Sequence, residues 1–69
     1  MIIYPNLERL IEARNYKKKD IAAALGITPR SLMNKLAGNT EFTWREVEIL
    51  QARFFPDHFK ETLMQRERS

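Results

Sequence analysis

Residues 17–38 read KKKDIAAALGITPRSLMNKLAG, and the rest of the chain is organised around them. Apolar residues recur at helical spacing in two short runs, and Gly26 stands between the two runs. Glycine is favoured directly after a helix because it adopts a left-handed backbone conformation without a steric cost. The pattern therefore predicts a helix over 18–25, followed by a tight turn over 26–28.

Thr28 and Pro29 predict where the second helix of this stretch begins. A threonine at this point can cap free backbone N–H groups, and proline suits the first helical position because its missing N–H would have no partner there. Leu32 and Leu36 supply the apolar face of a helix expected over 29–37. Two short helices joined by a glycine-containing turn predict a helix-turn-helix, with the axes at ~90–120° to each other.

Local signals predict three more helices outside residues 17–38. A proline suited to the first turn marks two of them, at Pro5 and at Pro56. The remaining helix has a capping box, in which Thr43 and the glutamate three residues later each bond the other's backbone N–H. The expected helices cover 5–14, 44–54 and 56–65. We therefore expect one all-α domain of five helices that spans the whole chain (1–69).

The basic charge is concentrated in the middle of the chain. The formal net charge of the whole chain is +3, whereas residues 14–40 hold six basic residues and one acidic residue. A basic centre in slightly acidic surroundings indicates a focused patch that faces an anion.

The residue types needed for catalysis or metal binding are scarce. His58 is the only histidine, no cysteine occurs, and no glycine-rich phosphate loop or metal-ligand cluster can be assembled. We therefore expect no enzymatic activity, no cofactor, no metal and no small-molecule ligand. The lack of cysteine favours a reducing cytoplasm, and residues 1–10 lack the pattern of a signal peptide or a membrane anchor. The expected location is the cytoplasm, without membrane association.

The outward face of the second helix of the pair suits contact with DNA bases. Arg30 and Asn34 lie four residues apart, and their side chains can make paired hydrogen bonds to guanine and adenine edges. Pro29 offers only an apolar surface, such as one that rests against a thymine methyl group. Ser31 and Met33 are expected to contact either a base or the sugar–phosphate backbone.

Three lysines, Lys17, Lys18 and Lys19, stand at the start of the first helix of the pair. Taken alone, such a run is usually a solvated charge cluster. At a helix N-terminus, however, the helix dipole and the free N–H groups already favour a phosphate. The placement of the lysines and of the base-contacting residues around one tight turn therefore favours DNA binding.

The same residues resemble the helix-turn-helix of the phage Cro and repressor family. The resemblance rests on DIAAALGIT at 20–28, followed by Arg30, Ser31, Leu32, Leu36, Gly38, Phe42, Thr43 and Glu46, and it covers about residues 6–63. It implies a lambda-repressor-like five-helix DNA-binding domain, encoded by a phage or by its bacterial host. Such proteins are usually dimeric transcriptional repressors.

The resemblance also implies roles for single residues. It puts Pro29, Arg30 and Asn34 where family members touch base edges. The residues expected at phosphates are Lys17, Lys18, Lys19, Thr28, Asn39, Thr40 and Arg45. Two positions depart from the family: Lys17 replaces a common capping residue, and Pro29 replaces a common polar base reader. Because direct readout then falls mainly to Arg30 and Asn34, the operator sequence is hard to infer.

Large apolar residues are more frequent near the C-terminus than a small core requires. The surplus predicts a homodimer surface, because exposed apolar patches usually mark interfaces. The residues expected in this interface are Phe55, Phe59, Leu63 and Met64. A two-fold dimer would hold two base-contacting helices ~34 Å apart on a nearly palindromic operator. The alternative is a protein-interaction domain of the same fold, with an antirepressor or an antitoxin as its partner.

Overall fold

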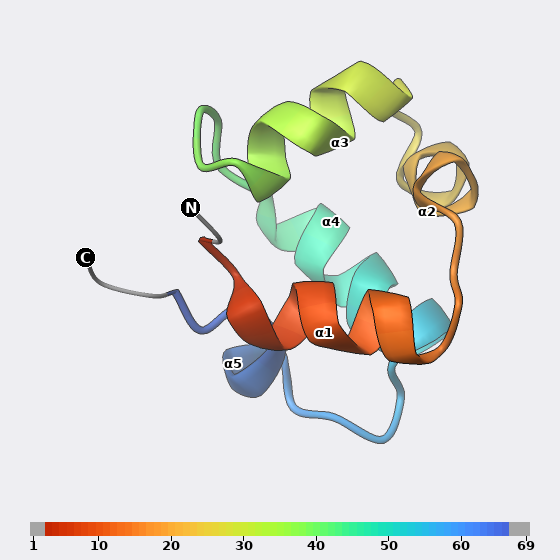
Figure 1. The fold of residues 1–69 in the computed structure, drawn as a ribbon, viewed down its shortest axis with the longest axis vertical. Helices are drawn as coiled ribbons and strands as arrows, with labels where there is room; N and C mark the ends of the chain where they lie inside the picture. The colour runs from red at the N-terminus through yellow and green to blue at the C-terminus, as the bar shows by residue number, and fades with distance from the viewer. Residues whose placement is uncertain (1–2, 67–69) are drawn as a thin grey trace.

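A computed structural model of the chain describes residues 3–66. Within these residues the chain forms five α-helices and a π-helical segment, and no strand (Figure 1). The elements are α1 (Pro5–Ala13), α2 (Lys18–Leu25), α3 (Pro29–Leu36), α4 (Trp44–Ile49), η1 (Leu50–Phe54) and α5 (Lys60–Leu63). The predicted all-α class is confirmed, and the predicted bounds of α1, α2 and α3 agree to within one residue. None of the described helices combines the length and the apolar character needed to cross a membrane.

Local capping signals account for the ends of the central helices. Gly26 ends α2 in the left-handed conformation, with φ of 74°, and Gly38 follows α3 with φ of 84°. The hydroxyl of Thr28 accepts a hydrogen bond from the backbone N–H of Ser31 at 3.1 Å, which caps α3. The capping box of α4 is complete, because the backbone N–H groups of Thr43 and Glu46 each donate to the other's side chain. The predictions made for Gly26, for the Thr28 cap and for the Thr43–Glu46 capping box are confirmed.

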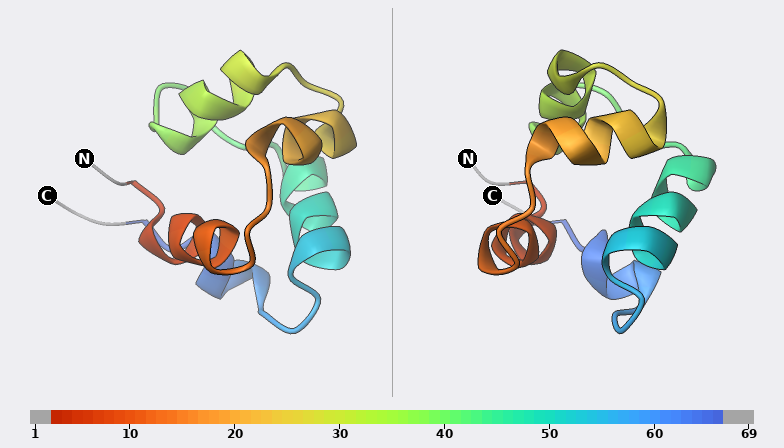
Figure 2. Two further views of the ribbon diagram at one scale, coloured as in Figure 1. Left: turned by 45° about the vertical axis from the view of Figure 1, so that its right-hand side comes forward. Right: turned by 90° about the vertical axis from the view of Figure 1, so that its right-hand side faces the viewer.

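One apolar core joins all the helices. In Figure 1, α3 lies at one end of the molecule and α1 and α5 lie at the other, with α2 and α4 between them. The two further views in Figure 2 show α1 and α5 next to each other, away from α3. The fully buried large side chains come from every helix except α4, whose Val47 is also buried. They are Leu7, Ile21, Leu25, Leu32, Leu50, Phe55 and Leu63.

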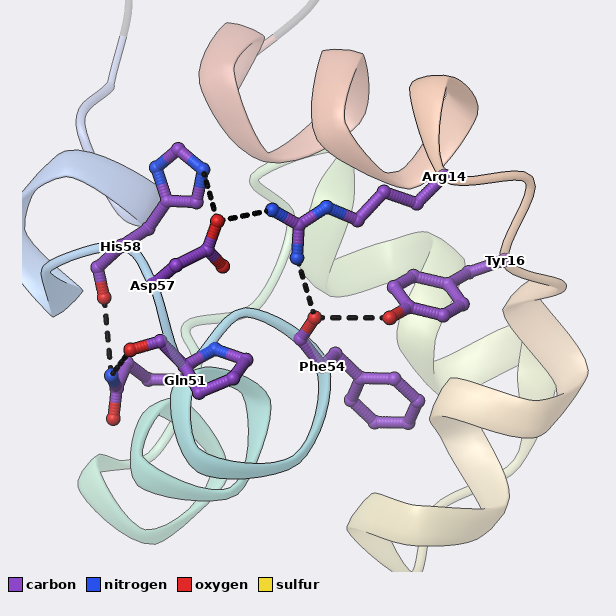
Figure 3. A network of polar contacts seen from close by, with 7 residues as sticks. Arg14, Tyr16, Gln51, Phe54, Asp57 and His58 are labelled. Atoms are coloured by element: carbon purple, nitrogen blue, oxygen red, sulfur yellow. Dashed lines mark hydrogen bonds and ion pairs between the residues drawn. The ribbon is translucent and has the colours of Figure 1, made fainter.

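The predicted helix over 44–54 is continuous, but its second half differs from the expectation. From Leu50 to Phe54 the helix is π-helical, which is a wider form than the α-helix. The carbonyl oxygen of Phe54, at the end of this segment, accepts hydrogen bonds from Arg14 Nη1 and from the hydroxyl of Tyr16, each at 3.1 Å (Figure 3). These donors come from the segment between α1 and α2, which is distant from Phe54 in the sequence. No local sequence pattern could therefore predict the contact.

The prediction of a helix over 56–65 is wrong at both ends, because α5 covers only Lys60–Leu63. Side-chain contacts hold residues 56–58 in a turn (Figure 3). Gln51 Nε2 donates to the carbonyl oxygens of Pro56 at 3.3 Å and of His58 at 3.1 Å. Gln51 thereby ties residues 56–58 into a turn that is not helical, so the helix begins later than Pro56 suggests.

The shorter α5 also corrects the predicted dimer surface. Phe55 and Leu63 have no solvent exposure, because both complete the core of their own chain. Met64 is partly buried and packs against the same core. Phe59 differs from all three, since 79% of its surface is exposed. Of the four predicted interface residues, Phe59 alone presents a large apolar surface to solvent.

Candidate nucleic-acid interface

Helix α3 presents a narrow polar face to solvent. Its opposite face is closed by Leu32 and Leu36, which are buried in the core. Pro29, Arg30 and Asn34 are all exposed. The structure therefore brings the three predicted base-contacting residues together on the outer side of one helix, at the edge of the molecule (Figure 1).

The neighbouring residues at the start of α3 and along it differ in whether their side chains already bond within the protein. Ser31 is partly buried, and its hydroxyl accepts a hydrogen bond from Thr28 Oγ1 at 3.1 Å. The Thr28 hydroxyl also caps the helix, so its first role is structural, although its side chain is exposed. Met33 is 53% exposed and lies next to Asn34 on the outer surface. Thr28 and Ser31 are thus coupled, whereas Met33 is open to contact.

The three lysines at the start of α2 differ from one another. Lys18 Nζ lies 3.4 Å from a carboxylate oxygen of Glu8, and the two side chains form an ion pair on the α1–α2 side. Lys17 and Lys19 are exposed and have no ion-pair partner among residues 3–66. The phosphate role predicted for all three lysines therefore fits Lys17 and Lys19 without rearrangement, but Lys18 would have to be shared with Glu8.

Ion pairs neutralise half of the six cations in the basic middle of the chain. Each pair joins one of these cations to an acid outside residues 14–40. The pairs are Arg14–Asp57 at 2.6 Å, Lys18–Glu8 at 3.4 Å and Lys35–Glu46 at 3.1 Å. A charge count along the sequence therefore overstates the field that this region presents. The remaining cations are Lys17, Lys19 and Arg30.

The Arg14–Asp57 pair shifts the pKa values of both of its members. The hydrogen bond between them lowers the pKa of Asp57 and raises the pKa of Arg14. Both groups therefore remain charged over a wider pH range than they would alone. His58 Nε2 lies 3.7 Å from the same Asp57 carboxylate, and Figure 3 shows this cluster beside the turn that precedes α5.

The connection from α3 to α4 and the first turn of α4 contain the other predicted phosphate contacts. Asn39, Thr40 and Arg45 are all exposed. The backbone N–H of Asn39 donates to the carbonyl oxygen of Asn34 at 2.9 Å, which ties the start of this connection to the end of α3. These residues are thus close in the chain to the outer face of α3, at the end away from the lysines.

Two features of the surface had no counterpart in the sequence analysis. Trp44 is 67% exposed, and Lys60 Nζ lies 5.3 Å from the centre of its ring. Lys35 and Glu46 form a buried ion pair between α3 and α4. In both cases the partners are eleven or more residues apart in the sequence, so helical periodicity could not reveal them.

One hollow on the described surface, of about 490 Å³, lies between α1 and the start of α2. Its lining combines carboxylates and ammonium groups, so neither an anion nor a cation is favoured over its whole surface. The lining residues are Glu8, Ile11, Glu12, Asn15, Tyr16, Lys17 and Lys18. Within residues 3–66, no three potential metal-ligating side chains are grouped together.

Comparisons with protein-family models, with curated proteins and with solved structures found no match to this chain.

The buried Glu46 makes stability depend on pH. Burial by itself raises the pKa of the Glu46 carboxyl, but hydrogen bonds from the Thr43 N–H and from Lys35 outweigh burial and leave the pKa below its ordinary value. The pKa of Glu46 is lower in the folded protein than in the unfolded chain. The carboxylate therefore makes its full contribution to folding stability at pH values above the unfolded pKa. That contribution is lost as the pH falls through the folded pKa.

Glu46→Gln tests this dependence, because glutamine keeps an acceptor for the Thr43 N–H but has no charge. The expected loss of stability at neutral pH is about 1–2 kcal/mol. Below about pH 4 the parent should lose more stability than this variant. Urea denaturation followed by circular dichroism measures both. Asp57→Asn is the control for the other carboxylate with a lowered pKa, and equal pH profiles of the parent and Glu46→Gln would contradict the assignment.

Proposed function

We propose that this protein is a sequence-specific double-stranded DNA-binding protein, a phage-type helix-turn-helix repressor that acts as a dimer on an operator. The observation that carries the proposal is the outer face of α3, where Arg30 and Asn34 are exposed four residues apart on a helix whose other face is buried. A major groove of B-form DNA is wide enough to admit such a helix.

In this proposal α3 enters the major groove and α2 crosses the phosphate backbone. Arg30 donates two hydrogen bonds to O6 and N7 of a guanine, and Asn34 pairs with N6 and N7 of an adenine. Pro29 and Met33 offer apolar contacts to thymine methyl groups or sugars. Phosphates are contacted by Lys17 and Lys19 at the start of α2, by Asn39 and Thr40 after α3, and by Arg45 at the start of α4.

A second copy would bind through the surface around Phe59. This residue and Trp44 are the most exposed large apolar side chains in the described chain, and Lys60 stands over the ring of Trp44. Apolar surface of this kind is usually covered in an assembly. A two-fold dimer would contact two half-sites of a nearly palindromic operator, and occupation of that operator would block transcription.

The alternative function is a protein-interaction domain with an antirepressor or antitoxin as its partner. Two observations favour it: the exposure of Trp44 and Phe59, and the neutralisation of half of the central basic charge by ion pairs. The alternative requires no contact through Arg30 or the lysines.

The salt dependence of DNA binding separates the two functions. Each neutralised phosphate releases counterions, so the logarithm of the association constant falls by ~0.9 per phosphate as the logarithm of the salt concentration rises. Contacts by Lys17, Lys19 and Arg45 predict a slope of roughly −2.7 for each bound chain. Fluorescence anisotropy with a labelled duplex at several salt concentrations measures the slope. A flat response, or no binding at low salt, would support the protein-interaction alternative.

Substitutions should separate base contacts from phosphate contacts. Arg30→Ala is expected to cost ~1–3 kcal/mol at the operator and to weaken the preference for it. Lys17→Ala is expected to weaken binding to all duplexes about equally and to reduce the magnitude of the salt slope by ~1. Both effects are measured by comparing binding to the operator with binding to random DNA. The operator is first selected from a random pool.

Arg9→Ala is the matched control, because it removes one positive charge from an exposed position on α1. Arg9 lines a small hollow formed by residues of α1 and α5. These two helices lie at the end of the molecule away from α3 (Figure 1). The Arg9→Ala substitution should change neither the salt slope nor the preference for the operator. Identical behaviour of the Arg30 and Lys17 variants would contradict the division into base and phosphate contacts.

The dimer surface is tested by Phe59→Ala. Because Phe59 is largely exposed, its loss should leave the fold of one chain intact while it weakens the dimer. Sedimentation velocity should show a dimer for the parent and a shift towards monomer for the variant. A parent that sediments as a monomer at all concentrations, or a variant that remains dimeric, would exclude this surface.

A further inference from the structure

The C-terminal end of α3 is attached to α4 by an ion pair between the partly buried Lys35 and the buried Glu46. Lys35 Nζ, from the last turn of α3, lies 3.1 Å from Glu46 Oε1 in the first turn of α4. The Lys35 side chain is 13% exposed and that of Glu46 is 8% exposed. Near the proposed DNA-binding face, Lys17, Lys19 and Arg30 are exposed to solvent, whereas Lys35 is not.

Both charged groups make further bonds. Lys35 Nζ also donates to the carbonyl oxygen of Glu41 at 3.0 Å and lies 5.9 Å from the ring centre of Phe42. Glu46 Oε1 also accepts the backbone N–H of Thr43 at 2.8 Å. The ammonium group is therefore held by Glu41 and Phe42 in the segment that connects α3 with α4, and by Glu46 in α4.

These contacts are directional, whereas the apolar contacts of α3 are not. Leu32 and Leu36 determine which face of α3 is buried, but apolar packing tolerates small changes in the tilt of a helix. A charge-assisted hydrogen bond has a narrow range of length and angle. The Thr28 cap bonds only groups at the start of α3 itself. The Lys35 pair, by contrast, ties α3 to α4, one residue after Asn34.

We infer that Lys35 and Glu46 are positioning residues for DNA recognition: their ion pair sets the pose of α3 in the major groove, and through it the sequence specificity. This inference rests on the proposed DNA-binding function. Lys35 does not contact phosphate itself, because its side chain is only 13% exposed and its ammonium group is already paired with Glu46. Specificity therefore depends on the pair, and the strength of non-specific DNA binding does not.

The experiment compares the parent with Lys35→Met, Glu46→Gln and the double variant. Methionine keeps much of the lysine's length and apolar volume, and glutamine keeps the cap of α4. For each protein, affinities are measured for the operator selected by the parent and for random DNA, over a range of salt concentrations. Circular dichroism at the assay temperature establishes that each variant is folded.

Each single substitution should lower the ratio of operator affinity to random-DNA affinity about tenfold, which is near the discrimination of one well-placed bidentate contact. The salt slope of Lys35→Met on random DNA should equal that of the parent. The double variant should lose no more specificity than the single variants, because both substitutions break the same pair. Lys35→Arg, which can still pair with Glu46, should retain most of the specificity.

Three results would overturn the inference alone: an unchanged affinity ratio in folded Lys35→Met, a salt slope reduced by ~0.9 in that variant, or losses that add in the double variant. A reduced slope would mean that Lys35 contacts a phosphate directly. If Lys35→Met does not fold, Glu46→Gln and Lys35→Arg decide the outcome by the same ratio. A parent that binds no DNA specifically would overturn the proposed function and this inference together.

Discussion

The carbonyl oxygen of Phe54 accepts two hydrogen bonds, and the arrangement of the other helices depends on this junction. Its donors, Arg14 and Tyr16, lie in the short connection between α1 and α2. The ring of Tyr16 also packs edge-on against Phe54 and Phe55, and the Arg14 guanidinium lies over the ring of Phe55. Because none of the described α-helices exceeds nine residues, each depends on tertiary contacts for its stability. The junction fixes where α2 starts, and hence where its lysines stand.

Ion pairs give the surface a different character from the one that the charge count indicates. Arg14, Lys18 and Lys35 are paired with acids from other parts of the chain. The cations that remain are few, and they lie at the start of α2 and on the outer face of α3. In a protein that binds DNA, such a distribution would leave modest non-specific attraction and a larger share of the affinity to base contacts. The pose of α3 would then matter more than the number of charges.

The helix boundaries show how far local signals reach. Gly26, the Thr28 cap and the Thr43 capping box act within four residues of their own positions, and the helices they delimit were predicted closely. Pro56 is an equally clear local signal, but Gln51 binds the carbonyls that follow it and delays the helix. Phe55 and Phe59 were both predicted in the dimer interface, yet one is buried and the other exposed, because the turn between them is not helical.

The sequence by itself determined the all-helical class, the bounds of α1 to α3, the start of α4 and the outward placement of Arg30 and Asn34. Each of these follows from propensity, capping or periodicity over one or two helical turns. Only the tertiary structure decided the π-helical segment, the short α5, the identity of the exposed aromatic residues and the pairing of the basic side chains. These features depend on contacts between residues distant in the chain, such as Arg14 with Asp57 and Lys35 with Glu46, which no local pattern encodes.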